Sequence, residues 1–225
     1  MDQCFDNIKY FDDLDSSNDY LIRSYKNHDF SELLTVYTDV QNKGRGRIGH
    51  KWFSGIDHGL TFSFSLDLSD DINPFDITML TSYSIVCLLR QFGCIAYIKY
   101  PNDIIVDNQK IAGILTELIS NSIKKYIIVG VGVNVNHQVF PEDLPEAVSM
   151  KQLLNQSFDK LILFKSLIEI ITNWMKVYKK NRHQLISAYM PSVLGYKDYV
   201  LCLYNGERIY VKILSFTNQG FLSVE

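Results

Sequence analysis

The chain has 225 residues, of which 47% are hydrophobic, and its formal net charge is −3 at pH 7. This length and apolar content are sufficient for one substantial folded domain and a small second one, and they argue against intrinsic disorder. The acidic balance argues against a general nucleic-acid binder, which needs a clustered basic excess, so any phosphate group must be met by a local cluster of cations.

The N-terminal residues lack the basic and apolar regions of a signal peptide, and no later segment reaches about 18 consecutive apolar residues. We therefore expect a soluble, cytoplasmic protein with no membrane partner. The four cysteines and five histidines are dispersed along the chain. Their spacing predicts a reducing compartment and no zinc site.

The first helix is predicted to begin near residue 15, where the sequence has polar residues that favour a helix N-terminus. These residues are Ser16, Ser17, Asn18 and Asp19, and capping is their ordinary role. Residues 33–38 are predicted to form a buried strand that leads to Gln41. Residues 60–66 alternate apolar side chains with Thr or Ser, which is the pattern of a half-buried strand.

Between these two strands lies a basic, glycine-rich loop at residues 41–53, which reads Gln-Asn-Lys-Gly-Arg-Gly-Arg-Ile-Gly-His-Lys-Trp-Phe. Glycines let a backbone lie close against a ligand, and the arginines and lysines supply positive charge. The loop therefore suits an anion. A mobile basic surface turn would give the same pattern, if the motif is taken alone.

A helix is predicted over residues 76–92, with its apolar face in the core. Residues 95–136 follow as a meander of three antiparallel strands, with turns at 107–109 and 121–122. A meander with helices packed on it indicates an α+β fold with a mixed, largely antiparallel sheet and helices on one face.

The C-terminal part contains two predicted helices and a hairpin. A long amphipathic helix is capped by Ser157 or Asp159, and a shorter helix covers residues 182–189. The Asn-Gly turn at 205–206 predicts a hairpin over residues 199–213. A further strand is expected to begin after it.

Three more stretches carry chemistry. Residues 99–103 read Lys-Tyr-Pro-Asn-Asp at a strand end, and residues 110–117 read Lys-Ile-Ala-Gly-Ile-Leu-Thr-Glu, so that Lys110 heads the next strand. Residues 130–136 read Gly-Val-Gly-Val-Asn-Val-Asn. Each motif alone is weak, but their order and spacing form a consistent set.

Together, these motifs resemble the biotin protein ligases, from about Leu14 to the C-terminus. The resemblance implies a catalytic domain at 1–190, related to lipoate ligases and class II aminoacyl-tRNA synthetases, and a small SH3-like β-barrel at 191–225. The barrel is expected to be cut short, because the family's last strands are not found. The short segment before residue 15 leaves no room for a DNA-binding domain, so we expect the monofunctional type.

The resemblance also implies roles for individual residues. The expected catalytic residues are Lys110 and Arg47. The expected biotin-binding residues are Ser16, Ser17, Asn18, Gln41, Gly44, Arg45, Gly46, Arg47 and Lys110. The expected nucleotide-binding residues are Trp52, Asn102, Asp103 and Asn134, and Asp103 is also the expected ligand of Mg²⁺. Tyr100 and His50 depart from the family pattern, which has Trp and Arg there.

The implied reaction consumes biotin and ATP to form biotinyl-5′-AMP, and then transfers biotin to a lysine of a biotin carboxyl-carrier protein. Lys110, Arg45 and Arg47 would stabilise charge at the phosphate. No nucleic-acid partner is expected, and a homodimer is an open possibility. Two alternatives stand beside this interpretation: a lipoate or octanoate ligase of the same superfamily, and a non-catalytic biotin-binding module.

Overall fold

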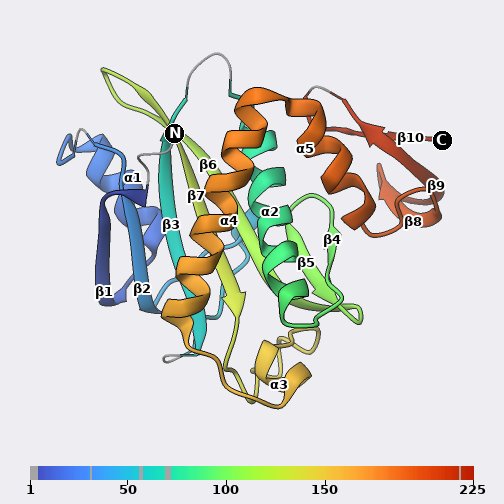
Figure 1. Cartoon of the computed structure of the whole chain (residues 1–225), viewed down its shortest axis with the longest axis horizontal. Coiled ribbons are helices and arrows are strands. Elements are labelled where there is room, and N and C mark those ends of the chain that lie inside the picture. The colour runs from blue at the N-terminus through green and yellow to red at the C-terminus, as the bar shows by residue number, and fades with distance from the viewer. Residues whose placement is uncertain (1–4, 31, 56–57, 69–71, 218) are drawn as a thin grey trace.

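The structure is a computed structural model that describes residues 5–30, 32–55, 58–68, 72–217 and 219–225. These residues form a seven-stranded sheet in the order β1-β2-β3-β7-β6-β5-β4 and a three-stranded sheet in the order β10-β9-β8 (Figure 1). The larger sheet contains β1 (Ile8–Leu14), β2 (Thr35–Gln41), β3 (Gly59–Asp67), β4 (Tyr97–Lys99), β5 (Asp103–Val106), β6 (Gln109–Ser120) and β7 (Lys125–Asn134). Among the described strand pairs of the larger sheet, β1–β2 alone is parallel, so the predicted α+β class and mixed, largely antiparallel sheet are confirmed.

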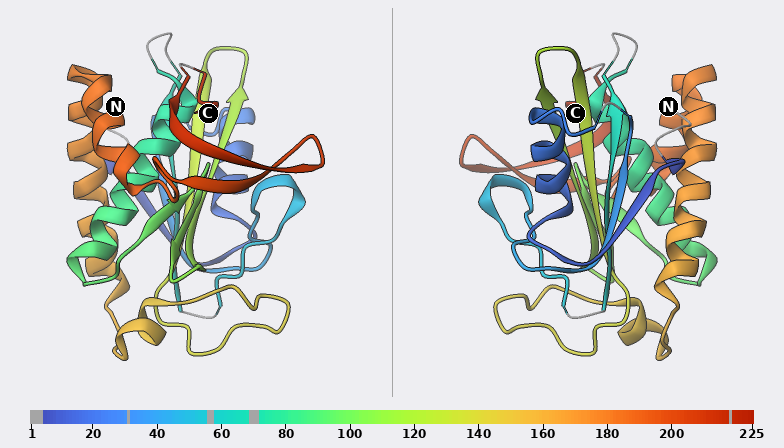
Figure 2. Two further views of the ribbon diagram at one scale, coloured as in Figure 1. Left: turned by 90° about the vertical axis from the view of Figure 1, so that its right-hand side faces the viewer. Right: turned by 90° about the vertical axis from the view of Figure 1, so that its left-hand side faces the viewer.

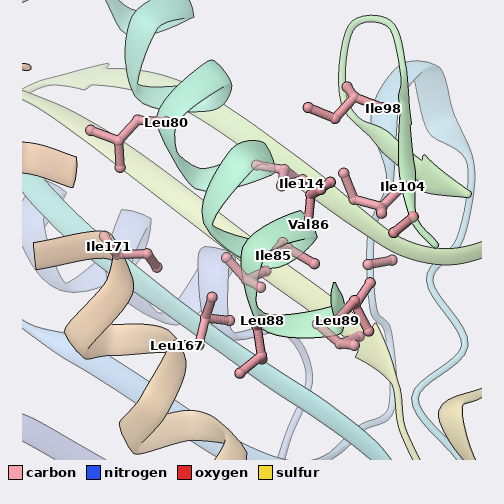
Figure 3. Packing of buried hydrophobic residues seen from close by; sticks show 14 of the residues in the cluster. Leu80, Ile85, Val86, Leu88, Leu89, Ile98, Ile104, Ile114, Leu167 and Ile171 are labelled. Carbon is pink, nitrogen blue, oxygen red and sulfur yellow. The ribbon is translucent and has the colours of Figure 1, made fainter. Parts of the chain in front are cut away.

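One face of the large sheet is apolar and carries the main core. Alternate residues of β3, such as Phe62 and Phe64, point into this core and are fully buried. Helices α2 (Pro74–Gln91) and α4 (Lys160–Lys180) cover the face, as predicted. Figure 3 shows their packing, with Leu88 of α2 beside Leu167 of α4.

The other face of the sheet carries a smaller core and leaves space for a cleft. Helix α1 (Ser17–Lys26) packs there through Leu21 and Tyr25, which belong to one buried cluster with Ile128 of β7 and Val36 of β2. Figure 2 shows α1 on the opposite side of the sheet from α2 and α4. Helix α1 thus departs from the prediction that the helices pack on one face of the sheet.

Some element boundaries differ from the prediction for local reasons. Strand β1 was not predicted. Helix α2 begins at Pro74, two residues early, because Asn73 caps it and proline suits the first helical position. Residues 95–136 form four strands, since a turn at 100–102 separates β4 from β5. The short helix α3 (Met150–Leu154) was not predicted, although a capping box formed by Ser149 and Gln152 marks its start.

The predicted C-terminal elements are present. Helix α5 (Arg182–Tyr189) precedes β8 (Tyr199–Tyr204), β9 (Glu207–Phe216) and β10 (Leu222–Val224). Asn205 and Gly206 both have positive φ, as a tight hairpin turn requires. The small sheet is consistent with the expected SH3-like unit, and the domain division at residue 190 remains a prediction.

The small sheet packs against the larger part of the protein through aromatic rings. Phe216 lies 5.4 Å from Tyr100 and 5.5 Å from Phe75, measured between ring centroids. The Tyr100 hydroxyl also donates a hydrogen bond to the Gly220 carbonyl at 2.6 Å. The small sheet therefore contacts the same Tyr-Pro-Asn-Asp turn that was singled out in the sequence.

One of the four cysteines, Cys4, lies outside the described residues. Within the described part of the chain, no helix has the length and apolar character needed to cross a membrane.

Candidate active site

The floor of the cleft is a patch of small residues on the sheet face that α1 partly covers. Ser63 of β3 pairs with Gly130 of β7, and Gly113 of β6 pairs with Gly132 of β7. A Cβ atom on Gly132 would overlap the Trp52 ring, and one on Gly130 would overlap the Asn18 amide. The two glycines therefore leave the space in which Trp52 and Asn18 lie against the sheet.

The glycine-rich loop folds back on itself beside this floor. Arg45 and Lys51 form an antiparallel bridge, and the Trp52 amide donates to the Gly44 carbonyl at 2.9 Å. The loop turns at residues 47–49, where Ile48 and Gly49 have positive φ. This fold places Arg45, Arg47 and Lys51 among the residues that line the cleft.

The base of the loop is closed by hydrogen bonds. The Ser54 hydroxyl accepts from the Gln41 amide at 3.0 Å and donates to the Gln41 carbonyl at 3.2 Å. His137, which is 1% exposed, contacts the Ser54 carbonyl through Nε2 at 2.9 Å. Burial lowers the pKa of His137 to about 4 although the Ser54 contact opposes this shift, so the imidazole is neutral and donates from Nε2.

A buried polar wall forms one side of the cleft, where α1 begins. Ser16 is the N-cap of α1, as predicted. The backbone amide and hydroxyl of Ser17 both donate to Gln41 Oε1, at 2.8 and 2.9 Å. The Ser63 hydroxyl donates to Asn18 Oδ1 at 2.6 Å and is also 2.6 Å from the Ser17 hydroxyl. The structure thus brings Ser17, Asn18 and Gln41 together.

Arg45 extends this wall by contacting two carboxylates. Its guanidinium lies 2.7 Å from Asp19 of α1 and 2.8 Å from Glu117 of β6. Burial lowers the pKa of Arg45, but hydrogen bonds to Glu117 and Asp19 outweigh this effect and raise it above its usual value.

The opposite side of the cleft holds Lys110, which a β-bulge directs to this face. The pairing of β5 with β6 skips Ile111. Ile111 and Ala112 are both buried in the main core, whereas Lys110 and Gly113 line the cleft. A bulge changes the face on which a side chain lies, and this one places Lys110 beside Asp103, with Nζ 2.7 Å from the carboxylate.

Arg47 and Trp52 complete the site near Lys110. Arg47 donates to Asn102 Oδ1 at 2.9 Å. The Lys110 ammonium lies 5.9 Å from the centroid of the Trp52 ring. Trp52 Nε1 is buried without a hydrogen-bond partner, so it is a donor that a ligand could satisfy.

The cleft has an empty volume of about 790 Å³, including space open to solvent. The predicted site residues that line it are Ser16, Ser17, Asn18, Gln41, Arg45, Gly46, Arg47, Trp52, Asn102, Asp103 and Lys110. Two predicted residues lie outside the lining. Gly44 packs against the Trp52 carbonyl, and Asn134 donates to the Lys110 carbonyl at 3.3 Å.

Four further residues lie in or beside the site and were not predicted to belong to it: Ser63, Glu117, Gly113 and Lys51. Asp19, which was expected only to favour the helix start, also contacts Arg45. Period-two alternation on β3 and β6 would have placed Ser63, Gly113 and Glu117 on the face opposite the core. No cluster of three or more potential metal ligands occurs among the described residues.

Comparisons with a family model and with known proteins agree on one family. The model of the "Biotin/lipoate A/B protein ligase family" matches residues 10–134. The chain is 27% identical to the bifunctional ligase/repressor BirA of Bacillus subtilis (strain 168), over 96% of this chain and 68% of that protein. It is 34% identical to the chloroplastic biotin–protein ligase 1 of Arabidopsis thaliana, over 49% of this chain and 32% of that protein.

Solved structures share the fold. The biotin protein ligase from Aquifex aeolicus in complex with biotin and ATP has a TM-score of 0.83 and 26% identity, over 98% of this chain and 92% of that chain. The biotin protein ligase from Leishmania major in complex with biotinyl-5-AMP has a TM-score of 0.66 and 19% identity, over 98% and 95%. At that lower identity the likeness concerns the fold alone.

Proposed function

This chain belongs to the biotin/lipoate A/B protein ligase family, and on that premise we propose that it activates biotin with ATP and transfers the biotinyl group to a lysine of a carrier protein. The observation that carries the proposal is the convergence of Lys110, Arg47 and Trp52 on one glycine-floored cleft. The likeness of the whole chain to a ligase solved with biotin and ATP supports it.

In the first step, a carboxylate oxygen of biotin attacks the α-phosphorus of ATP. An O–P bond forms, the bond to the β-phosphate bridge breaks, and pyrophosphate leaves with its electron pair. Lys110 would lie between the two anions and reduce their repulsion, and Arg47 would meet the phosphoryl oxygens with its planar fork. Fixed cations in a partly dry cleft stabilise this developing charge better than water does.

In the second step, the neutral amine of a carrier lysine attacks the acyl carbon of biotinyl-5′-AMP. An amide bond forms, the acyl–phosphate bond breaks, AMP leaves with the electron pair, and the proton that the nitrogen loses passes to solvent. The same two cations would stabilise the AMP leaving group. The carrier must therefore reach the mouth of the cleft, where residues 47–51 lie.

For biotin itself, we propose the polar wall as the binding side. The hydroxyls and amides of Ser16, Ser17, Asn18 and Gln41 offer the mixed donors and acceptors that a ureido ring requires. Gly44 and Gly46 allow the loop backbone to approach the ligand.

For the nucleotide, we propose Trp52 as the ring that stacks on adenine, and Asn102 and Asp103 on the phosphate side. Asn134 would act through the Lys110 carbonyl that it contacts. Magnesium fits as an ion carried by ATP, because Mg²⁺ commonly binds through one or two carboxylates and substrate phosphates. Asp103 would supply the carboxylate, and the ion would then replace Lys110 as its partner.

The test is pyrophosphate release from the purified chain with biotin and ATP, followed by mass measurement of a carrier domain. We expect release only when both substrates are present, and a carrier mass gain of one biotinyl group. Lys110→Ala should lose the activity. Lys124→Ala, which removes a surface lysine paired with Asp67, should keep it.

Each alternative gives a different result in the same assay. Activity with lipoate or octanoate but not with biotin would replace the biotin assignment by the related ligase. Biotin binding without pyrophosphate release would indicate a non-catalytic biotin-binding module.

A further inference from the structure

Arg45 and Arg47 are two residues apart, yet their surroundings differ sharply. Arg45 uses Nε and both terminal nitrogens toward carboxylates: Nε donates to Asp19 at 3.0 Å, and the terminal nitrogens donate to Glu117 at 2.8 to 3.0 Å. A guanidinium has five N–H donors in a fixed plane. Most of that capacity is used before any ligand arrives.

The local charge also indicates that Arg45 is not available to bind a phosphate. One guanidinium faces the carboxylates of Asp19 and Glu117, so the cluster has a net negative charge and would repel a phosphate. Arg47 instead donates to the neutral amide of Asn102. Arg47 therefore keeps its positive charge available at the cleft, and Arg45 does not.

Glu117 also connects Arg45 to the polar wall. Its carboxylate accepts from Asn18 Nδ2 at 2.8 Å, and Asn18 in turn accepts from the Ser63 hydroxyl. Asn18 is 3% exposed and lies in the space left by Gly130. Glu117 thus fixes both the loop arginine and the amide that faces the ligand.

We propose that Arg45 and Glu117 form a preformed positioning clamp that joins the glycine-rich loop to α1 and β6 and fixes the biotin-side wall. The clamp deepens the proposed function and rests on it. Arg45 is a positioning residue, and the phosphate charge is met by Arg47 and Lys110. The loop is consequently anchored up to Gly46 without ligand, and only the turn beyond it rearranges on binding.

The test uses Arg45→Gln, Glu117→Gln and the double variant, with biotin affinity measured by calorimetry without ATP. Each single change should weaken biotin binding about tenfold, which is the usual effect of losing a charged hydrogen bond. The double variant should have the same biotin affinity as the single variant with the lower affinity, because both changes remove the same Arg45–Glu117 interaction. The KM for ATP should stay within about twofold of the unmodified protein.

Arg23→Gln is the matched control. It removes from α1 an arginine that pairs with Asp15 and lies outside the cleft lining, and it should leave biotin affinity unchanged. An Arg45→Gln variant with normal biotin affinity and a tenfold higher KM for ATP would overturn the clamp and make Arg45 a phosphate ligand. Additive losses in the double variant would also overturn it.

Ligand-free hydrogen exchange separates this inference from the proposed function. The clamp predicts protected amides at residues 42–46 that lose protection in both single variants but not in Arg23→Gln. If the unmodified protein fails to bind biotin while this pattern holds, the proposed function is wrong and the clamp stands. If biotin binds but residues 42–46 exchange freely, the clamp is wrong.

Discussion

Acidification should destabilise this protein through one histidine at the base of the loop. The His137 side chain is enclosed by the rings of Phe53 and Phe140, with centroid distances of 5.7 and 4.8 Å, and it contacts the Ser54 carbonyl. Burial is the main cause that lowers its pKa to about 4, and its electrostatic interactions with His58 and Lys160 add to the shift.

The sign and size of the effect follow from proton linkage. In the unfolded chain the histidine has a pKa of about 6.5. Between pH 6.5 and pH 4 the unfolded state therefore binds a proton at this histidine and the folded state does not. Stability is fully present above pH 6.5 and is lost as the pH falls toward 4. The loss amounts to about 2 kcal/mol between pH 7 and pH 5, and to about 3 kcal/mol in all.

Urea unfolding at pH 7 and pH 5 measures this loss, with His137→Gln as the reference. Glutamine retains an N–H donor for the Ser54 carbonyl but does not titrate. All other titrating groups are common to both proteins, so the unmodified protein should lose about 2 kcal/mol more than the variant over this interval. An equal loss in both proteins would refute the reasoning.

Three further predictions concern the cleft. Lys110→Ala and Arg47→Ala should each lower the rate of adenylate formation at least about tenfold, with the melting curve nearly unchanged; wild-type rates in either variant would contradict the assignment. Gly130→Ala should weaken biotin binding, because its methyl group would displace the Asn18 amide; calorimetry showing unaltered affinity would count against the proposed binding wall. Amides at residues 47–50 should exchange rapidly without ligand and become protected with biotin and ATP, and protection in the ligand-free protein would be the contrary result.

The sequence predicted the sheet face because the alternation in β3 is local. Phe62 points into the core and Ser63 points to the cleft, as period two requires. The bulge at Ile111 could not be predicted from the sequence, because it is defined by the pairing of β6 with β5 and not by either strand alone. Strand β1 was missed for a related reason: it has a pairing partner on only one side, and its residues show little burial to produce a pattern.

The different roles of Arg45 and Arg47 could not be predicted from the sequence. In a Gly-Arg-Gly-Arg motif they are equivalent, and a shared role at the phosphate is the natural expectation. The carboxylates that distinguish them lie 26 and 72 residues from Arg45 along the chain, and no local period reports such partners. The backbone adds to the difference: Arg45 lies in a β-bridge, whereas Arg47 begins a tight turn, so the two side chains meet different surroundings. The division of labour between them is therefore a property of the folded chain.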